Sequence, residues 1–357
     1  MTDTPHILTF SALNKFRTCE RMYRLRYEDE IVPKGRAAGA LAFGSLIHQC
    51  LETWYGFQQT ASAGVSDWSS QAALVAILSL IDTARPDRDT KPWEKKDWML
   101  ARAMMTGYAA RYPVEPFTVS SIEQTFTGTI VNPETGAQSR TFTMAGKLDM
   151  MVTMADDGRP CLVEHKTART VGEGYRERLW CDTQIALYVH YAKQFGFKNI
   201  AGVLYNVLLK AGLQQSVGET EEEYAVRAAE LAAKNKSGKS NAKRRLPETD
   251  DEFSARLMEW YGQPKAFHRE MIYITPQREA MLEQEVWEIT QRYLAARRRG
   301  VWLPNTAACW QYNRACDYWP LCSSDMDPLV LDECFEHRAA HEELGLAEAE
   351  RIEDCPF

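Results

Sequence analysis

The 357-residue sequence contains no apolar run of the roughly 18 to 20 residues that a membrane-spanning helix needs. Its first residues, Met-Thr-Asp-Thr-Pro, lack the basic and apolar segments of a signal peptide. No GxxxxGK[ST] phosphate loop occurs either, which excludes a recognisable ATP-driven motor. These absences predict a cytoplasmic protein that makes no contact with a membrane.

A framework of disulfide bonds is also not expected. The chain has nine cysteines, an odd number, and it lacks an export signal that would direct it to an oxidising compartment. Some of these cysteines are therefore candidate metal ligands. The net charge of −7 is unevenly distributed: residues 325–357 hold eleven acids and two arginines, which leaves the rest close to neutral. A hydrophobic content of 45% with 25% charged residues is typical of a soluble globular protein.

Residues 145–167 carry the strongest chemical pattern in the chain. Two apolar runs are joined by an Asp-Asp-Gly turn at Gly158, which predicts a β-hairpin with Asp149 and Glu164 side by side. Two such carboxylates repel each other unless a cation lies between them, and oxygen ligands suit Mg²⁺ or Mn²⁺. Lys166 lies two residues after Glu164 and so shares its face of the strand. This arrangement can cleave a phosphodiester, although a solvated surface pair of acid and lysine is the commoner occurrence.

The neighbouring segments predict an α/β fold. Residues 119–131 and 141–153 alternate as strands do, and with residues 161–165 they form an antiparallel meander. A helix over residues 180–195 followed by an apolar strand over residues 200–209 implies a parallel crossover onto the same sheet.

Two further helices carry polar candidates. Gln184 and Tyr188 are four residues apart and share a helix face, where they can position a lysine, a phosphate or a water. A helix over residues 40–57 carries Gly44 and, one turn later, His48. A lone histidine on a helix is more often a packing residue than a metal ligand. His48 is therefore a candidate ligand only if a metal site faces it.

Three cysteines lie in a loop over residues 305–323 that is rich in Trp, Tyr and Pro and lacks helical or strand periodicity. Three thiolates leave one coordination position, for which Cys19 is the candidate, on a predicted helix over residues 8–27 with Ser11 as its N-cap. All-cysteine ligation suits zinc or an iron–sulfur cluster. The three loop cysteines are Cys309, Cys316 and Cys322.

A basic segment without acids is a second candidate for binding phosphates, or else a solvated insertion. Its cations are Lys234, Lys236, Lys239, Lys243, Arg244 and Arg245. The chain ends in Glu-Asp-Cys-Pro-Phe, similar to the acidic tip of bacterial single-strand-binding proteins, which suggests recruitment by a recombination or single-strand-binding partner. A plain acidic tail is the alternative.

Together these motifs resemble the RecB-like branch of the PD-(D/E)XK nuclease superfamily. The matching positions, in family order, are Ser11-x-Leu13 with Cys19, Gly44-x3-His48, Gly146-x2-Asp149, Glu164-x-Lys166, Gln184-x3-Tyr188 and the C-terminal cysteines. The resemblance implies a restriction-endonuclease-like core, a mixed sheet flanked by helices.

The resemblance also implies roles for these residues. His48, Asp149, Glu164 and the carbonyl of His165 would bind Mg²⁺ or Mn²⁺, Lys166 would activate water, and Gln184 and Tyr188 would steady the site. Cys19 and the three loop cysteines would hold a [4Fe–4S] cluster, as in AddB-type and CRISPR-associated relatives, with Zn²⁺ as the alternative. The x6 spacing from Cys309 to Cys316 and the histidine inside the Glu-x-Lys motif depart from the family pattern.

The expected activity is that of a DNA exonuclease in recombination, repair or phage DNA metabolism. A nuclease of CRISPR spacer acquisition and a non-catalytic DNA-binding adaptor are the alternatives, the adaptor being disfavoured because every expected active-site position is filled. The expected divisions are a helical region (1–118), the nuclease core (119–210), an insertion with a return strand (211–300), a cysteine loop (301–325) and an acidic tail (326–357).

Overall fold

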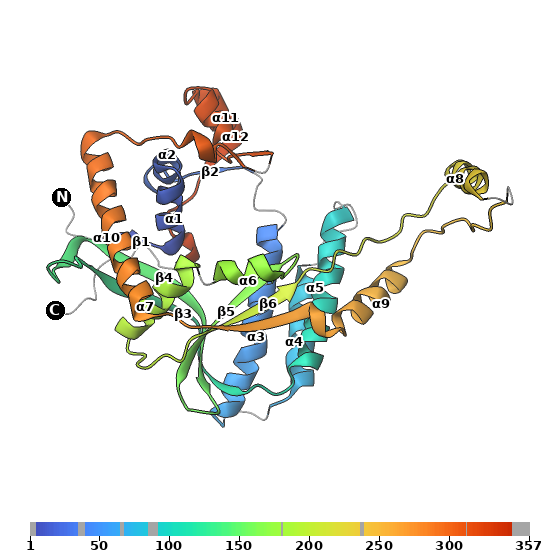
Figure 1. Ribbon diagram of the computed structural model, residues 1–357, viewed down its shortest axis with the longest axis horizontal. Coiled ribbons are helices and arrows are strands. Elements are labelled where there is room, and N and C mark those ends of the chain that lie inside the picture. The colour runs from blue at the N-terminus through green and yellow to red at the C-terminus, as the bar shows by residue number, and fades with distance from the viewer. Residues whose placement is uncertain are drawn as a thin grey trace.

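The structure, a computed structural model, describes residues 5–34, 40–64, 68–84, 92–179, 181–235, 239–311 and 313–344. At its centre lies a six-stranded mixed sheet in the order β1-β4-β5-β6-β7, with β3 paired to β4. Helices cover both faces of this sheet (Figure 1), which confirms the predicted α/β class. The strands are β1 (His6–Leu8), β3 (Phe117–Val131), β4 (Gln138–Met154), β5 (Pro160–Ala168), β6 (Val203–Leu209) and β7 (Phe267–Ile272).

The predicted meander and crossover are both present. β3, β4 and β5 are antiparallel neighbours, and β5 pairs with β6 in parallel. The connection contains two helices, α6 (Glu173–Leu179) and α7 (Thr183–Gln194), where the sequence predicted one. The second begins at Thr183 because the Asp182 carboxylate caps it by accepting the Gln184 backbone N–H.

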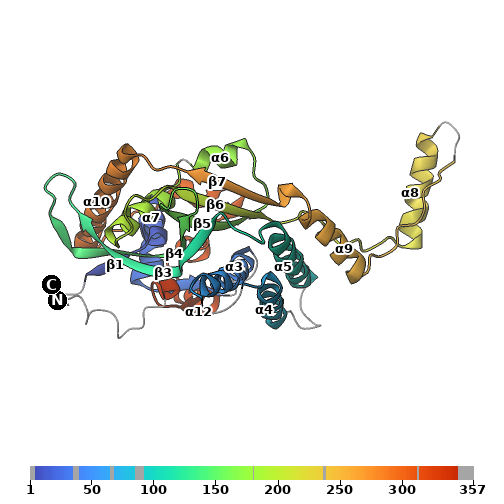
Figure 2. The same cartoon turned by 90° about the horizontal axis from the view of Figure 1, so that it is seen from below.

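Alternation along the strands builds a core on each face of the sheet. On β5, Leu162 joins one cluster and Val163 the other. Figure 2 shows α7 and α10 (Pro276–Arg299) on one face and α3, α4 and α5 on the other. α1 (Phe10–Thr18) packs against α10, while α9 (Asp250–Tyr261) packs against α5. The bounds of the remaining helices of the second face are α3 (Ala40–Ser62), α4 (Ser70–Thr83) and α5 (Pro92–Arg111).

The edge of β4 that faces β1 and β5 determines where a site can form. The opposite edge pairs with β3 from residue 138 to residue 154. On this edge, β4 pairs with β1 over residues 142–144 and with β5 over residues 150–153. Residues 145–149 lie between these two partners, at the place where β4 and β5 separate.

The N-terminal helix differs from the prediction of one helix over residues 8–27. Thr9, not Ser11, is the N-cap, since its hydroxyl accepts the backbone N–H of Ala12. The helix ends at Thr18, and Cys19 is extended (φ −164°, ψ 116°) before α2 (Glu20–Tyr23) begins. The break is stabilised from a distant segment, because Asn305 donates its side-chain N–H to the Thr18 carbonyl over 2.8 Å.

The C-terminal segment packs on this N-terminal region. β10 (Phe335–His337) pairs with β2 (Ile31–Pro33), and a small core joins Leu25 to Tyr318 and Leu321. The same segment contains β8 (Trp310–Gln311), β9 (Arg314–Ala315), α11 (Trp319–Ser323) and α12 (Pro328–Cys334). The two ends of the described chain therefore form one unit.

Two features lie outside the predicted 119–210 core. β1 and β7 belong to the same sheet although they come from residues 6–8 and 267–272. α8 (Glu221–Lys234) stands away from the body on two extended connections, as both views show (Figures 1 and 2). None of the described helices is long and apolar enough to cross a membrane.

Candidate active site

Asp149 and Glu164 lie side by side where β4 and β5 separate. The last paired residues are Met150 and Val163, so the two acids come directly after the end of the ladder. The backbone N–H of His165 donates to the Asp149 carboxylate over 2.7 Å. The Glu164 side chain is only 2% exposed. The hairpin therefore brings the two predicted carboxylates together, and the end of strand pairing leaves room beside them.

A chain of polar contacts connects Glu164 to α7. Lys166 Nζ lies 2.5 Å from Glu164 Oε1 and 3.2 Å from Gln184 Oε1. Gln184 Nε2 in turn donates to the Tyr188 hydroxyl over 3.1 Å. Period two on β5 and the four-residue spacing on α7 aim these groups at one another. Lys166, Gln184 and Tyr188 thus meet as the sequence spacing suggested.

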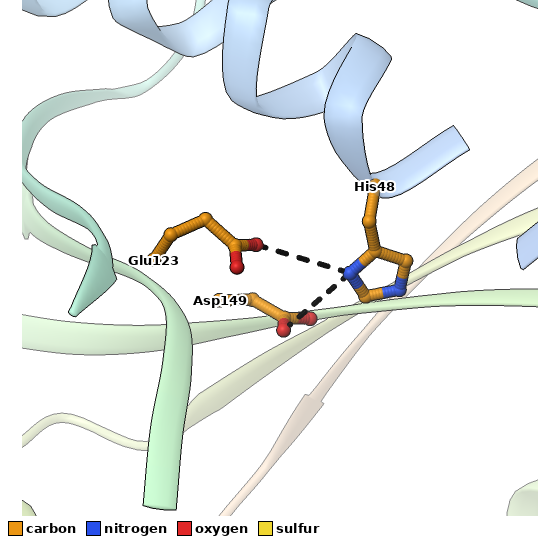
Figure 3. A group of neighbouring side chains, drawn as sticks. All are labelled: His48, Glu123 and Asp149. Carbon is orange, nitrogen blue, oxygen red and sulfur yellow. Dashed lines mark ion pairs between the residues drawn. The ribbon is translucent and has the colours of Figure 1, made fainter. Parts of the chain in front are cut away.

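His48 approaches the same carboxylates from α3. Its Nδ1 atom lies 3.5 Å from Asp149 and 4.0 Å from Glu123 on β3 (Figure 3). One ligand atom from each of these three residues lies within 4.8 Å of the other two. A single cation can therefore contact all three side chains.

Glu123 is the member of this group that the sequence analysis missed. It has φ of 48°, rare for a residue other than glycine, and it follows a register shift in β3 between Val119 and Ser121. The sequence contains a sign of this irregularity: the apolar residues Val119 and Ile122 are three residues apart, an odd spacing for one face of a strand. In the structure both contact the same core. An odd spacing on one strand face requires an extra residue, and it leaves Ile122 on the face of Val119. The positive φ of Glu123 is a second departure from regular strand geometry, at the residue whose carboxylate lies 4.0 Å from His48.

His165 lies in the motif, and its ring faces away from Glu164. The ring is buried, stacks on Tyr55 at 5.6 Å and lies within hydrogen-bonding distance, 2.9 Å, of Asn206 Nδ2. Burial holds the pKa of His165 well below its ordinary value, so the ring is neutral. His165 thus anchors the strand through its buried ring, which lies edge-on to the His48 ring at 6.2 Å, while its main-chain N–H contacts Asp149.

Burial sets the protonation of the acids. It raises the pKa of Asp149 to about 7, in spite of Lys166 and the His165 N–H. It also raises the pKa of Glu164 to about 7, with a further contribution from Asp149. Burial lowers the pKa of His48, so its imidazole is neutral and can act as a ligand. For Lys166, burial is outweighed by the Glu164 and Asp149 carboxylates, which keep its pKa above the ordinary value.

These residues fit a divalent cation. The Glu164 Oε2 atom is buried and has no hydrogen-bond partner among the described residues. A buried carboxylate oxygen without a partner is costly, and a cation would compensate both this atom and the repulsion from Asp149. Carboxylate oxygens with one neutral imidazole are a donor set that Mg²⁺ or Mn²⁺ accepts.

Gly146 lies three residues before Asp149, and Gly44 lies four residues before His48. Close contacts leave no room for a side chain at Gly146 but do leave room at Gly44. A Cβ at Gly146 would lie 2.6 Å from the Phe126 ring and 3.3 Å from Tyr188, so a side chain there would displace the site. A Cβ at Gly44 would meet nothing closer than Thr167 at 3.9 Å, which is ordinary contact. No close contact with a described residue therefore requires a glycine at residue 44.

The four predicted cluster cysteines come together from both ends of the chain. Burial raises the pKa of Cys309, and the thiols of Cys316 and Cys19 raise it further. The same two thiols also act on Cys322. Among the described residues, however, no three of these sulfur atoms lie within 4.8 Å of one another. Asn305 donates its backbone N–H to the Cys19 sulfur over 3.4 Å, which connects the loop to the helix break.

The predicted basic segment lies on the connection that carries α8. Arg244 pairs with Glu221 at 3.2 Å, and the Arg245 backbone N–H donates to Glu219. These contacts fold the segment back onto the start of α8 and offset part of its charge. Lys234, Lys239 and Lys243 lie at exposed positions, whereas Lys236 and the acidic tip at residues 353–357 are outside the described residues.

A mixed α/β sheet with two carboxylates and a lysine where two strands separate is the arrangement of metal-dependent nucleases. The family model of the PD-(D/E)XK nuclease superfamily matches residues 7–323, and the chain belongs to this superfamily. No match was found among curated proteins. Family membership supports nuclease chemistry without specifying the substrate or the pathway.

We expect Glu123→Gln to weaken Mn²⁺ binding by about tenfold or more, because the variant removes the negative charge from one of the three side chains that can contact the cation. Isothermal titration with Mn²⁺ measures this. Glu134→Gln, the same change at an exposed position of the β3–β4 turn, is the matched control. Equal Mn²⁺ affinities for the Glu123→Gln and wild-type proteins would exclude Glu123 from the site.

Proposed function

We propose that the chain is a metal-dependent DNA exonuclease that uses Asp149, Glu164 and Lys166. The observation that carries the proposal is the buried Glu164 carboxylate, with one oxygen bonded to Lys166 and the other without a partner beside Asp149. A bound Mg²⁺ or Mn²⁺ would polarise the scissile phosphate and lower the pKa of an attacking water. His48, Asp149, Glu164 and the His165 carbonyl are the proposed ligands, with Glu123 added on the geometry of Figure 3.

The remaining residues act on the substrate and the proton. Lys166 keeps its positive charge next to the carboxylates, where it can orient the attacking water and offset the charge that develops on phosphate. Gln184 accepts a hydrogen bond from Lys166 and is itself held by Tyr188. The lysine is therefore fixed from α7 while Glu164 fixes it from β5, which preorganises its ammonium group.

Substrate and pathway follow from the family resemblance and from the absence of a motor sequence. We propose that the enzyme degrades DNA from an end, in recombination, repair or phage DNA metabolism, and that it acts without ATP-driven unwinding of its own. A recombination or single-strand-binding protein is the proposed partner, through the acidic C-terminal tip.

Digestion of end-labelled linear DNA, single- and double-stranded, tests this proposal with closed circular single-stranded DNA as the matched substrate. The expected result is progressive release of short products from linear DNA with Mg²⁺ or Mn²⁺, none with EDTA, and intact circles. Cleavage of circles as fast as of linear DNA would instead make the protein an endonuclease. No cleavage of any of these DNAs would refute nuclease action on DNA.

We further propose that Cys19, Cys309, Cys316 and Cys322 bind a [4Fe–4S] cluster. A tetrahedral zinc site with Zn–S bonds of about 2.3 Å requires sulfur atoms only about 3.8 Å apart. A [4Fe–4S] cluster tolerates a wider spacing, because each cysteine binds a different iron atom. The mutual influence of the thiols of Cys19, Cys309, Cys316 and Cys322 supports one shared metal group at this place. Such a cluster would join the break after α1 to the C-terminal loop and hold the two chain ends together.

Cys19→Ser is expected to lose most of the bound iron and the visible absorption, and to melt at a lower temperature. Iron content, absorption and thermal unfolding of anaerobically purified protein measure these effects. Cys181→Ser, at an exposed cysteine outside this group, is the control and should resemble the wild type. A colourless wild-type protein that contains zinc would assign the other metal.

We propose that the exposed lysines beside α8 contact DNA phosphates. The charge of Arg244 is already partly offset by Glu221, so Lys234 and Lys243 are the positions to replace. The slope of DNA affinity against salt concentration should become shallower by about one unit per lost contact. An unchanged slope in the doubly substituted protein would make this segment a solvated insertion.

A further inference from the structure

A pocket of about 230 Å³ opens beside the proposed metal site. It lies along residues 145–149 of β4, in the interval between the β1 and β5 pairings. The first turn of α1, which follows β1 directly, forms its opposite wall. Its lining residues are Thr9, Phe10, Ser11, Gly146, Lys147, Asp149, Tyr188 and Leu344.

The position of the pocket restricts what can occupy it. Asp149 belongs both to the pocket wall and to the group that can hold a cation. A ligand in the pocket therefore lies next to whatever group is bound at the cation. If that group is a phosphodiester, its nearest neighbour in the substrate is the nucleotide to which the phosphate is attached.

The size of the pocket fits one nucleotide unit better than a length of chain. Pockets that bury a drug-sized ligand measure about 300–1,000 Å³, and this one is smaller. Leu344, from the last described turn, is buried against the sheet and forms part of the wall. A strand that enters from the metal site would meet this wall, against which it can place a terminal unit.

The chemistry of the wall also fits a nucleotide. Lys147 is a cation that now pairs with Glu123 at 2.5 Å, and Glu123 is one of the three side chains that can contact the cation. Engagement of Glu123 by a cation would free Lys147 for a phosphate. Phe10 offers a ring for a base to stack on, and the small side chain of Ser11 leaves the space beside it open. Ser11 does not cap α1, because Thr9 does. Its place in the pocket wall gives Ser11 another role.

We propose that this pocket binds the nucleotide attached to the scissile phosphate, with Lys147 contacting phosphate and Ser11 at the pocket wall. The proposal rests on the proposed nuclease function. It gives that function a physical basis for acting at DNA ends, because a small pocket bounded by Leu344 favours a terminal nucleotide over continuous chain.

Binding of mononucleotides tests the pocket without any cleavage. Deoxyadenosine 5′-monophosphate and its 3′-monophosphate contain no diester, so calorimetry with Mn²⁺ measures their affinity directly. We expect the wild type to bind at least one of them. Ser11→Phe, which fills the pocket, should weaken that binding by about tenfold or more, whereas Ser11→Ala leaves the pocket open and should change it by less than about threefold.

Lys147 provides a second pair of variants that does not depend on filling the pocket. Lys147→Ala should weaken mononucleotide binding by about tenfold, and Lys147→Arg should restore most of the affinity. Mn²⁺ affinity measured without nucleotide shows whether Lys147→Ala acts through Glu123 instead. A loss of nucleotide binding that is fully explained by lost Mn²⁺ binding would contradict a direct phosphate contact.

Two results would overturn the pocket itself: no binding of either mononucleotide by the wild type, or equal affinities for Ser11→Phe and Ser11→Ala. Failure of the proposed function has a different signature, a wild-type protein that cuts no DNA whether or not it binds mononucleotides through this pocket. The two ideas can therefore fail separately.

Discussion

Lys166→Met is expected to lower the single-turnover cleavage rate by about 10³-fold while DNA affinity changes little. Methionine keeps most of the length and apolar stem of lysine but removes the ammonium group that lies between Glu164 and Gln184. That group is charged in the structure, so its loss removes charge stabilisation that is needed most in the transition state. Binding of DNA in Ca²⁺, measured by fluorescence anisotropy, separates affinity from chemistry.

Lys193→Met is the matched control for this experiment. Lys193 lies on α7 and pairs with Glu279 at 2.6 Å, so the substitution also removes a charged partner but at a distance from the carboxylates. It should leave the cleavage rate within about twofold of the wild type, as expected for an exposed ion pair. If Lys166→Met and Lys193→Met cleave equally well, Lys166 is not catalytic.

Glu164→Gln is expected to abolish cleavage and, in EDTA, to raise the melting temperature at pH 8. Glutamine has nearly the same shape, yet it carries no charge to bury next to Asp149. Burial raises the pKa of Glu164 to about 7 in the folded protein, whereas an unfolded glutamate titrates near 4.3. The wild type without a cation therefore buries a charge at pH 8 that Glu164→Gln does not.

The sign of the pH dependence follows from proton binding. Between about pH 4 and pH 7 the folded protein retains a proton that the unfolded chain has released, so stability falls as pH rises through this window. Below the window both states are protonated and the penalty vanishes. The stability advantage of Glu164→Gln should thus be a few degrees at pH 8 and near zero at pH 4.

Mn²⁺ should reverse the order at pH 8, because the wild type gains more stability than Glu164→Gln from binding the cation. Thermal unfolding with EDTA and with Mn²⁺ measures both effects. Glu279→Gln, at an acid outside the site, should show neither the gain nor the loss. A Glu164→Gln protein that is stabilised by Mn²⁺ as strongly as the wild type would remove Glu164 from the ligand set.

The sequence alone was sufficient to predict the β4–β5 hairpin and the contact between Gln184 and Tyr188 on α7, because both depend on residues that are close in the chain. The Asp-Asp-Gly turn and the alternation of β4 and β5 place Asp149 beside Glu164, and a four-residue spacing places Gln184 near Tyr188. Two predicted helix ends were wrong. The first helix ends before Cys19 instead of continuing to residue 27, and α7 begins at Thr183 instead of residue 180. The contact from Asn305 stabilises the first end, and a distant contact of that kind leaves no local signal.

Long-range packing decided the rest of the site. Glu123 has a positive φ and lies beside His48, although these residues come from different elements far apart in the sequence. The pocket exists because β1 and β5 share one edge of β4 and leave residues 145–149 between them. Strand pairing between distant segments depends on the whole core, whereas turn chemistry and periodicity are local. The sequence by itself therefore determined the motif of two carboxylates and a lysine, and only the tertiary structure decided the additional carboxylate and the cavity beside it.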